Sequence, residues 1–112
     1  MPPSPDALPL TEPTLLILLS LSPGPKHGYA IMKEVETLSD GRVLLSTGTL
    51  YGGLKRLLDE GWIMRVDDPE PNGTDRQRKA YILTDQGRDI LRAEVERLRK
   101  LVKVAQVRVV EA

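Results

Sequence analysis

The first strongly hydrophobic stretch of the chain is residues 15–21, where six of seven positions are aliphatic. Placed on a helix, these aliphatic residues fall on all sides, which is typical of a helix buried at the centre of a fold. Thr11 stands before the stretch as a potential cap, Pro13 lies where a first turn tolerates proline, and the sequence Pro-Gly-Pro at 23–25 ends the stretch. The pattern therefore predicts a central helix that ends at Leu21.

Residues 27–38 form an amphipathic stretch that opens with His27-Gly28-Tyr29. Its charged positions lie mostly on one side and apolar residues recur at helical spacing on the other, so the stretch predicts a second helix. After a turn at Asp40-Gly41, the apolar run 43–45 is too short for a helix but long enough for a small strand. The apolar stripe of the second helix consists of Tyr29, Ile31, Met32, Val35 and Leu38.

A third helix is predicted over residues 46–60. Ser46 and Thr47 are good capping residues, and Gly61 stops the run. Four leucines recur at helical spacing, so the helix should pack one side inward and show the opposite side to solvent. These leucines are Leu50, Leu54, Leu57 and Leu58.

Two strand-like pieces follow, at residues 62–66 and 79–83. The loop between them contains prolines and the turn sequence Asn72-Gly73, so the two pieces predict a β-hairpin with a long tip. Trp62 stands at the entry to the hairpin and is expected to pack in the core.

The last helix is predicted over residues 84–112, with Thr84 as its cap. Its apolar positions are spaced alternately by four and three residues, the repeat that pairs one helix with another. Because the chain has little else to cover this stripe, we expect the same helix of a second copy to do so, in a homodimer. The predicted dimer interface consists of Leu91, Val95, Leu98, Val102, Ala105 and Val109.

The element order α-α-β-α-β-β describes a winged helix, a helix-turn-helix extended by a hairpin wing. The expected fold class is mainly α with a small β-hairpin, a winged helix-turn-helix followed by a C-terminal dimerisation helix. Residues 1–9 are rich in proline and should form a flexible or loosely docked arm. Residues 10–83 then form the DNA-binding domain and residues 84–112 the dimerisation helix.

Composition narrows the classes of function. The chain has 112 residues, enough for one core, and no cysteine, which removes disulfides and thiolate sites and is compatible with a cytoplasmic location. With a single histidine and no carboxylate cluster at ligand spacing, we expect no metal and no cofactor.

The apolar run 15–21 is too short to cross a bilayer, so no membrane partner is expected. Nucleophile–base pairs and phosphate loops at usable spacing are also missing from the sequence, so we do not expect an enzyme.

Sixteen basic residues balance sixteen acidic ones, so a DNA-binding function must rest on local charge. In a helix-turn-helix the second helix of the motif enters the major groove, and here that is the helix 46–60. Its outer side offers short hydroxyls and glycines where a backbone must approach DNA, and cations suited to phosphates. The alternative reading is a capped helix with a solvated polar face. The outward residues are Thr47, Gly48, Thr49, Gly52, Lys55 and Arg56.

Two other places carry candidate DNA contacts. The hairpin tip brings Arg76, Arg78 and Lys79 close together, where they can reach phosphates or a minor groove; a merely solvated charge run is the alternative. The start of the second helix has free backbone N–H groups that favour a phosphate, with Lys26, His27 and Tyr29 beside them. For His27, a packing or capping role at the turn is equally open.

Several separated blocks, in the right order over about residues 10–91, resemble the PadR family of bacterial transcriptional regulators. The blocks are His27-Gly28-Tyr29, Gly48-Thr49-Leu50-Tyr51, Leu54-Lys55-Arg56-Leu57, Gly61-Trp62-Ile63, Arg78-Lys79-Ala80-Tyr81, and Leu83-Thr84 with Gly87. The resemblance implies a dimeric repressor that binds a palindromic operator in double-stranded DNA and releases it on binding a small, often aromatic, effector. It also implies that Tyr51 and Lys55 lie at the DNA backbone, and that the single last helix belongs to the shorter subgroup.

The chain departs from the family pattern at two places. Gly52-Gly53 replaces the bulkier or proline-containing pair that usually follows the tyrosine, so groove contacts should differ. The last helix has no aromatic residue, so an aromatic-lined drug pore is not expected. The leading hypothesis is a sequence-specific DNA-binding transcriptional regulator. The alternative, favoured by the zero net charge and small wing, is a winged-helix module for protein contacts or ligand sensing without DNA binding.

Overall fold

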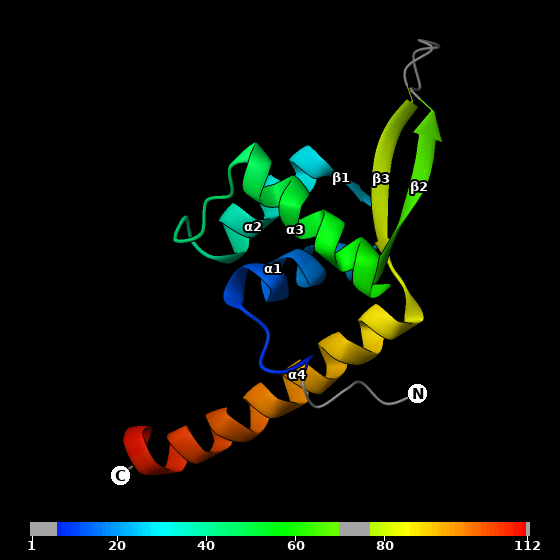
Figure 1. The fold of residues 1–112 in the computed structure, drawn as a ribbon. Helices are drawn as coiled ribbons and strands as arrows, with labels where there is room; N and C mark the ends of the chain where they lie inside the picture. The colour runs from blue at the N-terminus through cyan, green and yellow to red at the C-terminus, as the bar shows by residue number, and fades with distance from the viewer. Residues whose placement is uncertain (1–6, 70–76, 112) are drawn as a thin grey trace.

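The structure is a computed structural model that describes residues 7–69 and 77–111 (Figure 1). Three helices, α1 (Glu12–Leu21), α2 (Gly28–Leu38) and α3 (Thr47–Glu60), form the compact part of the molecule. The strands β2 (Ile63–Pro69) and β3 (Gln77–Leu83) make the hairpin, with β1 (Lys26–His27) beside β3. The long helix α4 (Asp85–Ala105) runs below them and continues in the π-helical turn η2 (Gln106–Val110).

The starts of α1, α3 and α4 follow from short polar side chains that cap them. The hydroxyl oxygen of Thr11 accepts the backbone N–H of Thr14 at 3.3 Å, that of Ser46 accepts Thr49 N–H at 3.1 Å, and that of Thr84 accepts the N–H of Gly87 at 3.0 Å. Each cap satisfies a first-turn N–H that has no partner inside the helix. The helix starts predicted at these residues are confirmed.

The sheet has the strand order β1-β3-β2, and the strand predicted at 43–45 is wrong. The backbone N–H of Val43 is instead bound by the hydroxyl of Ser39 at 3.0 Å, which holds this segment in a loop. The third strand is Lys26–His27, which pairs antiparallel with β3 so that Lys26 lies opposite Tyr81. The true order is therefore α-β-α-α-β-β. The hairpin itself is confirmed, with strands that extend further toward the tip.

The core lies between α1, α2, α3, the sheet and the first half of α4. Helix α1 is central, as predicted, and Trp62 is buried. The predicted stripe of α2 is wrong at both ends: Tyr29 is 67% exposed, and Leu38, the last residue of the helix, is 45% exposed. Tyr29 lies on the side of Lys33, whose Nζ is 5.8 Å from its ring centroid, because helix positions two apart, such as 29 and 31, do not face the same way. The buried cluster consists of Leu16, Ile17, Leu18, Leu21, Ile31, Val35, Leu50, Leu54, Leu57, Trp62, Ile63, Tyr81, Leu83, Ile90 and Leu91.

A close joint attaches the start of α4 to the hairpin. The backbone N–H of Thr84 binds the carbonyl oxygen of Trp62 at 3.0 Å, and the Thr84 hydroxyl donates to the carbonyl of Gly61 at 2.6 Å. Gly87 packs so closely on Trp62 that a Cβ there would collide with the Trp62 carbonyl oxygen. The joint holds the first turn of α4 against the wing.

A second attachment ties α4 to the segment before α1. Glu94 is 1% exposed, and its carboxylate accepts the backbone N–H of Leu10 at 2.8 Å and binds the guanidinium of Arg97. Ala7 and Leu10 pack against the core. Within the arm expected at 1–9, the stretch 7–9 is therefore docked at Ala7, and residues 1–6 lie outside the described part of the chain.

Beyond Lys100, α4 and η2 project from the body of the molecule, and every described residue from 101 to 111 is exposed (Figure 1). Among the described residues, no helix is both long enough and apolar enough to cross a membrane.

Candidate nucleic-acid interface

Helix α3 lies on the surface with its leucines inward, as predicted. Leu50, Leu54 and Leu57 are buried, and Leu58 is half-buried. All six residues predicted to face outward are exposed, namely Thr47, Gly48, Thr49, Gly52, Lys55 and Arg56. The helix therefore presents a polar side that is free to meet another surface.

The middle of that outward side has no side chains. Gly48 and Gly52 stand one turn apart, and a Cβ added at either would meet no atom within 4 Å. Neither glycine is required by its own surroundings, and each costs a helix about 1 kcal/mol relative to alanine. The result is a strip of bare backbone that a neighbouring surface can approach closely.

The two cations of α3 point to different flanks. Lys55 is exposed and forms an ion pair with Asp59 at 3.4 Å. Arg56 lies on the side of α1, where it lines a cavity of about 230 Å³ together with Glu60 and Trp62. The other residues of this cavity are Ala7, Pro9, Leu10, Thr11, Thr14, Gly53 and Leu57. Arg56 thus stands at the edge of the outward side rather than on it.

Tyr51 lies on the flank of α3 that faces α2 and β3. Its side chain is 47% exposed, and its hydroxyl end lies against Gly28, the first residue of α2. Tyr81 of β3 is nearby: burial raises the pKa of the Tyr81 hydroxyl, the proximity of Tyr51 raises it further, and Arg65 opposes both. Three elements therefore meet around the Tyr51 ring.

The start of α2 differs in part from the prediction. Lys26 and His27 lie in β1 rather than in the first helical turn, because their backbones pair with β3. His27 is the residue before α2 but makes no side-chain cap, and its Nδ1 lies 3.2 Å from the carbonyl oxygen of Lys79. Tyr29 is in the first turn and exposed, with Lys33 Nζ 5.8 Å from its ring centroid.

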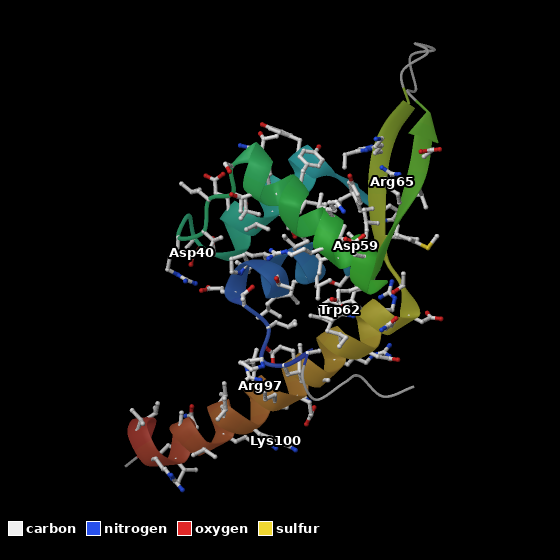
Figure 2. All side chains as sticks on the ribbon, viewed as in Figure 1. Asp40, Asp59, Trp62, Arg65, Arg97 and Lys100 are labelled. Carbon is white, nitrogen blue, oxygen red and sulfur yellow. The ribbon has the colours of Figure 1, made fainter. Side chains whose placement is uncertain are left out.

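The predicted cations of the wing are only partly described. Lys79 is exposed on β3, opposite Asp67 of β2. For Arg78 the structure describes only the backbone, which lies opposite that of Asp68. Arg76 lies outside the described residues. The structure adds Arg65 of β2, which is exposed and pairs in register with Tyr81; Figure 2 shows Arg65 on the hairpin, beyond Asp59 of α3. Sequence reasoning passed over Arg65 because it stands alone, away from the basic run at the tip.

The six residues predicted for the dimer interface differ in burial, from the first, which is buried, to the last, which is exposed. Leu91 is 8% exposed and belongs to the core, so it leaves almost no surface for a second copy. Val95 and Leu98 are half-buried, whereas Val102, Ala105 and Val109 are exposed. The apolar stripe thus begins inside the fold and continues on the projecting part of α4.

A second cavity, of about 410 Å³, opens where α1, the end of β3 and α4 meet. Its floor is apolar, with Leu19, Leu83, Leu91 and Val95, and its rim carries Ser22, Arg88, Arg92, Glu96 and Arg99. Arg92 is paired with Asp89 at 3.4 Å and Arg99 with Glu96 at 3.5 Å. An amphipathic molecule with a negative charge would find both kinds of contact there.

Comparison with known proteins gives one family and several similar structures. Residues 17–93 match the transcriptional regulator PadR-like family. Over 87 residues the chain is 36% identical to an uncharacterized 37.1 kDa protein in transposon TN4556 of Streptomyces fradiae. The match covers 78% of this chain but 23% of that protein, so the chain spans less than a quarter of this relative's length.

Two of the solved structures that resemble this chain are regulators of the same family. One is a PadR family transcription regulator from Clostridium difficile, 28% identical, with a TM-score of 0.71 over 86% of this chain and 96% of that chain. The other is Bacillus subtilis PadR in complex with operator DNA, 29% identical, with a TM-score of 0.67 over 78% of this chain and 48% of that chain.

Proposed function

Because the chain belongs to the transcriptional regulator PadR-like family, we propose that it is a sequence-specific DNA-binding regulator of transcription that reads the major groove with α3. One observation carries this proposal: α3 turns its leucines inward and exposes hydroxyls, bare backbone and a lysine to solvent. A similar structure, that of Bacillus subtilis PadR, is of a complex with operator DNA. Family and fold are those of transcriptional regulators, and no catalytic role is assigned to any residue.

The contacts divide into two kinds. Base contacts are assigned to Thr47 and Thr49, and the bare backbone at Gly48 and Gly52 supports this assignment because it allows close approach. Phosphate contacts, which position the helix without reading sequence, are assigned to basic side chains, one histidine and two tyrosines. These are Lys26, His27, Tyr29, Tyr51, Lys55, Arg56, Arg65 and the wing residues Arg76, Arg78 and Lys79.

We further propose that the protein acts as a homodimer, with the exposed stripe of α4 as the interface. The stripe has three apolar, regularly spaced residues that are exposed in the single chain, namely Val102, Ala105 and Val109. A second copy of α4 packed against them would remove them from water. A twofold dimer presents two α3 helices to successive major grooves, about 34 Å apart, so the operator should be an inverted repeat.

The proposed regulator is a repressor that acts in the cytoplasm and is released by a small aromatic effector. The cavity between α1, β3 and α4 suits such a ligand, because its apolar floor accommodates a ring and the guanidinium groups at its rim can donate hydrogen bonds to a carboxylate. Leu91 and Val95 line the cavity and also begin the α4 stripe, so an occupant would touch the helix that joins the two copies.

Selection of bound fragments from random duplex DNA tests the proposal. We expect one inverted repeat to be recovered, and affinity for it to fall steeply as salt rises, because phosphate contacts release counterions. The variant Lys55→Ala should lower the slope of log affinity against log salt by about one. Lys100→Ala is the matched control, since Lys100 is exposed on α4, far from α3 (Figure 2). A wild-type chain that shows no salt-dependent affinity for duplexes would be a protein-contact or ligand-sensing module instead.

A further inference from the structure

Gly28 is the first residue of α2 and is buried. Its backbone does not require glycine, because its φ lies outside the left-handed region that excludes other residues. The first turn of a helix also accepts most residue types. The reason for a glycine here must therefore lie in what surrounds it.

The surroundings of Gly28 contain the end of the Tyr51 side chain. A Cβ on Gly28 would lie 2.5 Å from the Tyr51 hydroxyl oxygen and 3.0 Å from its Cζ, closer than side-chain atoms approach one another. The next atom, Cδ2 of Leu50, would be 3.5 Å away, an ordinary contact. The phenol of Tyr51 thus occupies the space in which any other residue would place its side chain.

The collision would be relieved by the tyrosine rather than by the backbone. Tyr51 is almost half exposed, and its hydroxyl is the far end of a side chain that can rotate toward solvent. A methyl group at residue 28 would therefore move the phenol while leaving the packing of Leu50 and Leu54 in place. The fold tolerates such a movement, whereas a contact that depends on the position of the hydroxyl does not.

We propose that Gly28 is a positioning residue for Tyr51: by having no side chain it holds the Tyr51 hydroxyl at the junction of α2 and α3, in the pose that binds a phosphate of duplex DNA. The inference rests on the proposed function, since the pose of Tyr51 matters to binding only if DNA approaches α3. The contact between Gly28 and Tyr51 also links the two sequence blocks at 27–29 and 48–51, which lie far apart along the chain.

A double-mutant cycle on the full chain tests this role, with a labelled mixed-sequence duplex at low ionic strength as the probe. Tyr51→Ala removes the phosphate contact and should weaken binding about tenfold. Gly28→Ala should weaken it by a similar factor, because the phenol is displaced. The double variant should bind no more weakly than Tyr51→Ala alone, because the added methyl group then has nothing to displace.

Gly53→Ala is the matched control, since its Cβ would make only ordinary contacts, with Cδ1 of Ile17 at 3.6 Å and Nη2 of Arg56 at 3.9 Å, and Gly53 is buried on the inward side of α3. It should bind the duplex as the wild type does. Thermal unfolding adds a second readout: Gly28→Ala placed in the Tyr51→Ala background should unfold at or above the temperature of that background, because no phenol is left to collide with the methyl group and alanine is the better helix former.

The outcomes separate the two proposals. If the wild type binds the duplex and the two single effects multiply in the double variant, or Gly28→Ala binds normally, the positioning role of Gly28 is wrong and the regulator proposal stands. If the wild type ignores duplex DNA, the regulator proposal is wrong and the role of Gly28 is wrong with it.

Discussion

Helices α3 and α4 both carry an apolar stripe, but the fold treats the two stripes differently. The leucines of α3 are covered by α1, α2 and the sheet, so only its polar side meets solvent. The stripe of α4 is covered as far as Leu91 and partly at Val95, and beyond Lys100 the helix is exposed all round. Helix α3 therefore offers solvent a polar surface, whereas α4 also leaves an apolar stripe exposed.

The difference indicates which partner each helix suits. A surface with bare backbone, hydroxyls and a lysine paired with Asp59 has little apolar area to bury, and its favourable contacts are with a polar partner that offers hydrogen-bonding groups. Exposed valines, such as Val102 at 63%, gain free energy only when another apolar surface removes them from water. DNA fits the first description and a second copy of α4 fits the second.

The largest expected effect is on dimer affinity and follows from a charge placed in the apolar stripe of α4. Val102→Asp places a charge in the proposed interface of both copies, at a cost of about 2 kcal/mol each, so dimer affinity should fall roughly a thousandfold. Sedimentation equilibrium measures this change. Lys100→Asp, a charge reversal on the polar side of the same helix, should leave the dimer intact. Equal behaviour of the two variants would mean that the stripe is not the interface.

A smaller effect sharpens the description of α3. Gly52→Ala should raise the free energy of unfolding by about 1 kcal/mol, because alanine is the better helix former and the site is open. The same methyl group should weaken duplex binding about tenfold if DNA packs against the backbone there. Gly53→Ala shares the gain in helix propensity but faces inward, so its DNA affinity should not change. Chemical denaturation measures the free energy of unfolding, and titration with duplex DNA measures the affinity.

The smallest effect concerns the anchored half of α4 and appears in acid. The guanidinium of Arg97 and the N–H of Leu10 hold the pKa of Glu94 below its ordinary value, although burial opposes them. The charged carboxylate therefore stabilises the fold at pH values above its ordinary pKa, and this stability is lost as pH falls through the lowered pKa. Denaturation against pH should show a smaller loss on acidification in Glu94→Gln than in the wild type.

A control for this acid effect is Glu96→Gln, on the same helix. Glu96 is exposed and paired with Arg99 at 3.5 Å, so its replacement should leave the acid profile close to that of the wild type. An unchanged profile in Glu94→Gln would show that the attachment of α4 to Leu10 does not depend on the charge of Glu94.

Much of the fold was predictable because its signals are local. Thr11, Ser46 and Thr84 cap their helices through contacts that span three residues, and leucine spacing along 46–60 places one side of α3 inward. The hairpin was predictable from two short runs and a turn sequence. The outward residues of α3 followed from the same spacing, which is why the candidate interface was visible before the structure.

Contacts between distant residues were not predictable in this way. Tyr29 and Leu38 were assigned to the apolar stripe of α2, but the assembled fold leaves both exposed. The strand at Lys26–His27 forms because its backbone pairs with the edge of β3. In the segment 43–45, by contrast, the backbone N–H of Val43 donates to the hydroxyl of Ser39 instead of to a strand. Arg65 joins the candidate interface through its register with Tyr81, which no pattern along the chain contains.

The sequence by itself determined where the helices begin and which side of each is apolar, since periodicity and capping act over one or two turns. The tertiary structure decided how far each apolar side is covered. It buried Leu91 within its own chain, anchored Glu94 to Leu10, and placed the Tyr51 hydroxyl in the space left by Gly28. These outcomes depend on the packing of segments far apart in the chain, and burial is a property of the assembled surfaces rather than of any one segment.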